Sequence, residues 1–88
     1  MSQFLGMNPD EVRALATQFT QSAEQIRQLS NNLTSQLKNV SWSGPDQVRF
    51  SGDWDGTYVP NLTSIAGALD DAARMANQNA SEQDQASH

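Results

Sequence analysis

The acidic side chains are the residues whose types could support catalysis, but their spacing does not assemble a catalytic pair. Asp53 and Asp55 stand two residues apart, so on a helix their carboxylates do not face each other. Asp70 and Asp71 are direct neighbours, as on an ordinary solvated surface. General acid-base catalysis needs groups within hydrogen-bond reach of one reacting atom. Neither pair therefore predicts an active site.

Nucleophiles and metal ligands are equally scarce. The chain of 88 residues has no cysteine, and its one histidine is His88. Structural zinc sites draw on Cys and His ligands, and an activated nucleophile needs a base beside it. No glycine-rich loop joins a strand to a helix in the way that phosphate sites require. We therefore predict a protein that is not an enzyme and holds no metal and no cofactor.

Charge and hydropathy exclude two further classes of protein. The net charge is −5, whereas nucleic-acid binding needs lysine and arginine gathered on one face. The basic residues are instead spread along the chain: Arg13, Arg27, Lys38, Arg49 and Arg74. No stretch reaches the ~20 apolar residues of a membrane span, and the first residues lack the basic and apolar segments of a cleavable signal peptide. We expect no nucleic acid, no membrane insertion and no cleaved leader.

A long amphipathic helix is predicted from about residue 9 to residue 40. Asn8 can cap it, Pro9 suits its first position, and Asp10 and Glu11 favour the positive end of the helix dipole. Large apolar residues then recur every seven positions, the period of a helix that packs lengthwise against another. This dimer or hairpin seam consists of Val12, Phe19, Ile26, Leu33 and Val40, with Leu15 and Leu29 beside them.

A second helix is predicted over about residues 46–78. Its apolar stripe has spacings of three and four residues and consists of Phe50, Trp54, Tyr58, Leu62, Ile65 and Leu69. Pro60 lacks an N–H, and its ring crowds the carbonyl of Gly56 four residues earlier. Gly52 also lowers helix propensity. We therefore expect a bend near residues 52–60, or alternatively a helix that stops and restarts there.

Between the two helices, residues 41–45 predict a tight reversal of the chain. Trp42, Ser43, Gly44 and Pro45 combine a large apolar anchor with two residues that interrupt regular backbone. The predicted fold class is all-α, a hairpin of two long antiparallel helices over residues 8–80, preceded by an N-terminal arm at residues 1–7. Residues 81–88 carry no large apolar side chain and predict a flexible tail. The alternative is a segment that another protein recognises.

A hairpin of two helices has no third layer to cover the groove between them. A chain of 88 residues is also marginally stable by itself, and neither disulfides nor metal are available to it. Association with a second chain remains as the source of further buried surface. We therefore expect dimerisation into a four-helix bundle.

The chain resembles the WXG family of small helical-hairpin proteins, which type VII (ESX-type) secretion systems of actinobacteria and Gram-positive relatives export. The residues that carry the resemblance are Trp42, Ser43 and Gly44 at the joint, then Pro45, Asp46, Phe50, Trp54 and Pro60, within roughly residues 8–80. The resemblance implies an antiparallel dimer with itself or with a paralogous WXG-type protein. It also implies synthesis in the cytoplasm, export to the outside or the cell surface without a cleavable signal peptide, and recognition by the secretion ATPase.

One feature of that family is missing from this sequence. Exported pairs carry a Tyr-x-x-x-Asp/Glu motif after the second helix, whereas Ala76 and Ala80 stand at those positions here, and the one tyrosine, Tyr58, lies within the helical region. We hypothesise that a partner subunit supplies the export signal. Two alternatives stay open: a chaperone or adaptor subunit that pairs with a larger secreted toxin, and a cytosolic or phage helical adaptor unrelated to secretion.

Overall fold

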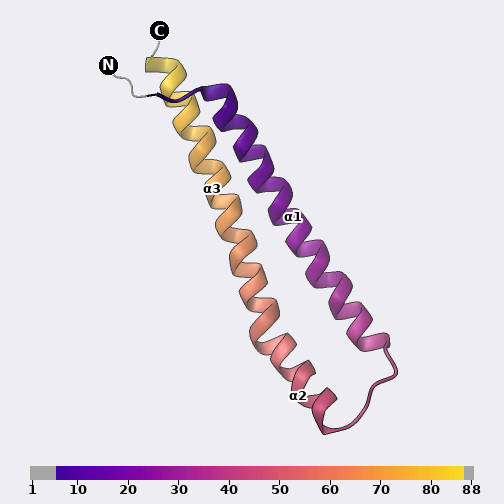
Figure 1. Ribbon diagram of the computed structural model, residues 1–88. Helices are drawn as coiled ribbons and strands as arrows, with labels where there is room; N and C mark the ends of the chain where they lie inside the picture. Colours follow the sequence, from indigo (N-terminus) through magenta and orange to yellow (C-terminus); the bar gives the residue numbers. More distant parts are fainter. Residues whose placement is uncertain (1–5, 87–88) are drawn as a thin grey trace.

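The computed structural model describes residues 6–86, and every regular element within them is helical. Helix α1 spans Pro9–Asn39, helix α2 spans Pro45–Asp53, a π-helical turn η1 spans Trp54–Tyr58, and helix α3 spans Val59–Ala86. The start of α1 and the end of α3 lie side by side, and the chain reverses at the far end (Figure 1). The molecule measures 64 × 17 × 14 Å. This arrangement confirms the predicted all-α hairpin.

The ends of α1 follow from its local sequence. The side-chain oxygen of Asn8 accepts hydrogen bonds from the backbone N–H groups of Asp10 and Glu11, at 3.1 and 3.2 Å. These bonds satisfy two of the donors that the first turn of a helix leaves free. At the other end, Val40 adopts extended backbone with φ −77° and ψ 145°, which ends the helix.

A line of small buried residues forms the contact between α1 and α3. The buried residues are spaced by seven on each helix and consist of Ala16, Ala23 and Ser30 on α1 and Ala66, Ala73 and Ala80 on α3. We call them the alanine line. Side chains this short let two helix backbones approach closely, and the seven-residue spacing keeps the contact along the whole length. The larger residues of the predicted seam lie beside this line.

The returning helix passes through Pro60 without a stop. Where we expected a bend, the structure has the π-helical turn η1, in which the N–H of Val59 bonds to the carbonyl of Trp54, five residues earlier. The residues on either side of this turn, Asp53 and Val59, both keep right-handed helical backbone. The alternative of a helix that stops and restarts near Pro60 is therefore wrong.

Helix α3 extends further than the sequence predicted. We expected the helix to end near residue 78 and a flexible tail from residue 81, yet the helix reaches Ala86. Ala80 is fully buried and Asp84 pairs with Arg13 of α1, so the last turns are held on α1 without any large apolar side chain. The expectation of a flexible tail is thus corrected for residues 81–86. Residues 87–88, and residues 1–5 of the predicted N-terminal arm, lie outside the described residues.

Candidate functional site

Two ion pairs cross the hairpin on one side. A guanidinium nitrogen of Arg27 lies 2.6 Å from a carboxylate oxygen of Asp70, and Arg13 pairs with Asp84. The hydrogen bonds with these carboxylates raise the pKa of Arg13 and of Arg27 above the ordinary arginine value. All four residues stand three positions before or four positions after a member of the alanine line. Residues at these positions of α1 and α3 therefore lie on the same side of the hairpin. We call it the ion-paired side.

The opposite side carries the large apolar residues of both helices. They stand three positions after or four positions before a buried residue, or directly before one. Because the ion pairs hold the polar sides of both helices at one edge, the two apolar rows meet at the other edge. We call this surface the apolar face, which consists of Val12, Leu15, Phe19, Ile26, Leu29 and Leu33 on α1 and Leu62, Ile65 and Leu69 on α3.

The apolar face is open to solvent in the single chain. Leu15 is 49% exposed, Leu29 52% and Ile65 51%. The remaining members are partly buried against the alanine line, apart from Leu33, which is also exposed. A monomeric protein seldom leaves so many large apolar side chains exposed in one contiguous patch, and such patches mark interaction sites. The structure thus places nine of the predicted seam residues on one side of the hairpin, where several of them are open to solvent.

Aromatic side chains continue this surface at the turn. The ring centroid of Phe50 lies 5.9 Å from that of Trp42 and 6.4 Å from that of Tyr58. All three side chains are more than two-fifths exposed. A groove of about 300 Å³ beside them is lined by Leu33, Gln36, Leu37, Val40, Phe50 and Trp54. The apolar face therefore extends without a break from α1 onto the turn end.

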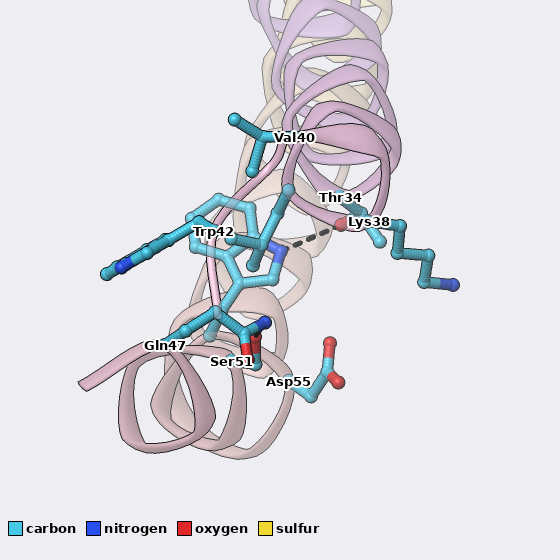
Figure 2. Close-up of a pocket in the computed structure, with 9 residues that line it drawn as sticks. Thr34, Lys38, Val40, Trp42, Gln47, Ser51 and Asp55 are labelled. Carbon is cyan, nitrogen blue, oxygen red and sulfur yellow. Dashed lines mark hydrogen bonds between the residues drawn. The ribbon is translucent and has the colours of Figure 1, made fainter. Parts of the chain in front are cut away.

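A hydrogen bond fixes the second tryptophan of the chain. The indole N–H of Trp54 donates to the hydroxyl of Thr34 at 2.8 Å, and that hydroxyl donates to the backbone carbonyl of Ser30 at 2.7 Å. Figure 2 shows this bond at the wall of a pocket of about 310 Å³, with Trp42 and Lys38 extending to opposite sides. The sequence predicted Trp54 as an apolar seam residue but did not predict this hydrogen bond. Trp54 and Thr34 lie on different helices, so the residue pattern of one helix does not reveal their contact.

The turn itself depends on Gly44. Its backbone has φ 119° and ψ 178°, a region that is essentially restricted to glycine. Its carbonyl accepts the N–H of Val48 at 3.1 Å, the first bond of α2, and Pro45 follows at the first helical position. Trp42, Ser43, Gly44 and Pro45 are all exposed. In the Trp-x-Gly sequence, the tryptophan thus supplies aromatic surface and the glycine supplies the backbone reversal.

Of the acidic residues considered first, Asp55 lines the pocket shown in Figure 2, and the other three lie outside it. Asp53, Asp55 and Asp71 are exposed, and Asp70 is the ion-pair partner of Arg27. Within residues 6–86 there is no group of His, Cys, Asp and Glu that could hold a metal ion. In the same range, no helix has the length and hydropathy of a membrane span.

The fold and the site define the class as a small all-α hairpin with a glycine reversal and one exposed apolar side. The chain belongs to the WXG100 family, proteins of about 100 residues with a Trp-x-Gly motif, whose family model matches residues 5–86. Members of this family are small helical, non-enzymatic substrates that type VII (ESX) systems secrete, and they typically dimerise with WXG partners. No curated protein and no solved structure matches this chain.

Proposed function

We propose that this protein is a substrate or partner subunit of a type VII secretion system and acts by dimerising through its apolar face. The observation that carries the proposal is the exposure of Leu15, Leu29 and Ile65 along one side of the hairpin. The whole molecule is 64 Å long and at most 17 Å wide, so one complete side covers at most about 1,000 Å². This is large enough for the ~800 Å² that each partner contributes to a stable protein interface.

The partner in this proposal is a second copy or a paralogous WXG-type hairpin. A second hairpin laid antiparallel on the apolar face would complete a four-helix bundle and supply the missing layer. The ion-paired side is the more polar of the two sides, so it faces solvent in the proposed dimer. Its charged residues are Arg13, Arg27, Asp70 and Asp84.

The partner also supplies the export signal. Tyr58 is the one tyrosine of the chain, and it lies in η1, far from the end of α3. Ala76 and Ala80 stand where the tyrosine and acid of exported pairs would be. Co-purification from cells that express the neighbouring genes tests this point. A self-dimer that is exported without any partner would contradict it.

Trp42 links the dimer to export in this proposal. The Trp end of one hairpin would lie beside the tail end of its antiparallel partner, where the secretion ATPase would bind both. Trp42 is 44% exposed, so its replacement should cost the fold little. We expect Trp42→Ala to reduce secretion while thermal unfolding and dimer mass change little, and Trp42→Phe to retain more secretion. Unfolding of Trp42→Ala would reduce Trp42 to a structural role.

Co-purification also separates the second candidate function. A chaperone or adaptor subunit would be recovered in a stable complex with a much larger secreted protein, whereas the proposed substrate would be recovered with a chain of its own size. Family membership supports secretion over a cytosolic or phage adaptor.

A further inference from the structure

The seven-residue frame of α3 does not continue into α2. Traced back from Ala66 by sevens, the frame reaches Val59 and then Gly52. In that frame Asp55 would join the apolar face and Phe50 would point to the far side of the hairpin. Instead, Phe50 lines the apolar groove at the turn end, and Asp55 lines the pocket of Figure 2, which also contains Thr34 and Lys38.

The π-helical turn accounts for this difference. The buried and partly buried residues of the returning helix step by three or four before and after it, at positions 47, 51 and 54 and at positions 59, 62 and 66. Between Trp54 and Val59 the step is five, and the N–H of Val59 bonds to the Trp54 carbonyl. One additional residue in a helical turn rotates the preceding segment by about 100° relative to the following one.

We propose that η1 is a register device that aligns two otherwise incompatible apolar stripes. Its additional residue rotates α2 so that Trp54 meets Thr34 and Phe50 continues the apolar face. The 2.8 Å bond between the Trp54 indole and the Thr34 hydroxyl holds the rotated segment on α1. Pro60 disfavours the α-helical alternative, because it offers no N–H to the carbonyl of Gly56 and its ring crowds that carbonyl. The turn end presents this surface whether or not the protein is exported.

Two single-residue deletions of opposite expected effect test the proposal. Deletion of Thr57 combined with Pro60→Ala removes the additional residue and the obstacle to an α-helical turn, so both stripes stay aligned. Deletion of Gln21, an exposed residue of α1, also removes one residue, but it rotates Ala16 away from the side that holds Ala23. Helix α1 is regular throughout, so it has no π-helical turn to absorb the loss.

We expect the Thr57 deletion to melt within about 5 °C of the Pro60→Ala variant, and the Gln21 deletion to melt more than about 15 °C lower or to lose its cooperative transition. Hydrogen exchange of the Trp54 indole N–H gives an independent readout. In the Thr57 deletion, exchange of this N–H should be as slow as in the natural sequence. In both backgrounds, adding Thr34→Val should accelerate the exchange. The proposal would be overturned if the two deletions lowered the melting temperature equally, or if neither lowered it. It would also be overturned if Thr34→Val no longer accelerated indole exchange in the Thr57 deletion.

Discussion

At position 44 the backbone geometry selects the residue type, and packing plays no part. Gly44 has φ 119°, and a Cβ placed there would meet no atom within 4 Å. The cost of any other residue is therefore conformational strain alone, of the order of 1–3 kcal/mol. This separates the role of the glycine in the Trp-x-Gly motif from that of the tryptophan.

Gly44→Ala should lower the free energy of unfolding by about 1–3 kcal/mol, measured by urea denaturation. Gly67→Ala is the matched control, because Gly67 lies within α3 and also has open space around it. There the helix propensity of alanine should raise stability by up to about 1 kcal/mol. Equal effects at both positions would show that the turn tolerates a side chain and that the motif glycine has another purpose.

Trp54 and Thr34 form a polar contact inside an otherwise apolar seam. Trp54→Phe removes the indole donor, and Thr34→Val leaves that donor without its acceptor. Each change should cost about 1 kcal/mol, with Thr34→Val the more damaging because it leaves a partly buried N–H unpaired. In a double-mutant cycle followed by thermal unfolding, the combined variant should lose less than the sum of the two. Simple additivity would mean that the 2.8 Å bond contributes nothing to stability.

At the scale of the helices, the contact between α1 and α3 is made by small residues. Ala23 is fully buried between the two backbones. Ala23→Leu should force the helices apart and cost about 1–3 kcal/mol. Ala14→Leu adds the same atoms at an exposed position of the same helix and should change stability by less than about 0.5 kcal/mol. Thermal unfolding of the two variants compares them directly, and equal tolerance would contradict the alanine line.

The end of α3 is held by its pairing with α1. Arg13→Gln should accelerate amide exchange over residues 81–86 several-fold, because Asp84 loses its partner on α1. Arg49→Gln breaks only the pair with Asp46 within α2 and serves as the control. Unchanged exchange in Arg13→Gln would mean that Ala80 alone holds the end of the helix.

This contribution should not depend on pH in the neutral range. The hydrogen bond with Asp84 raises the pKa of Arg13, so the guanidinium keeps its charge throughout the neutral range and loses its proton only at a pH far above that range. Between pH 6 and pH 9, roughly, added salt should weaken the pair and pH should not. The measurement is the protection of the amides of residues 81–86, that is, the intrinsic exchange rate divided by the observed rate at the same pH, at several salt concentrations and pH values. A marked pH dependence of this protection would point to a different group.

The sequence was sufficient for the elements that depend on local chemistry. The cap at Asn8, the seven-residue period of the seam and the reversal at Gly44 each follow from residues close together in the chain. The alanine line was not singled out, although Ala16 and Ala23 show its spacing, because large apolar residues carry the stronger periodic signal. The π-helical turn and the helical end at residues 81–86 depend on contacts between α1 and the returning helix. Patterns within one helix do not reveal such contacts.

One long side of the hairpin exposes large apolar side chains to solvent. Leu29 is 52% exposed on the apolar face, so Leu29→Asp should leave the single hairpin folded but place an unpaired charge in the proposed interface. We expect at least a hundred-fold weaker association, equivalent to about 3 kcal/mol. Gln28→Asp introduces the same charge one residue away and outside the apolar face, and it should associate normally. Equal association of both variants would place the interface elsewhere.

The molecular mass in solution shows directly whether the apolar face binds a second chain. Sedimentation equilibrium should be run on the protein alone and mixed with each small protein encoded beside its gene. We predict a species of about twice the single-chain mass of 9.6 kDa, either as a self-dimer or as a one-to-one pair. The Leu29→Asp variant should shift this species to the monomer mass. A natural chain that stays at the monomer mass in every mixture, while unfolding cooperatively, would contradict the claim that the apolar face needs a partner.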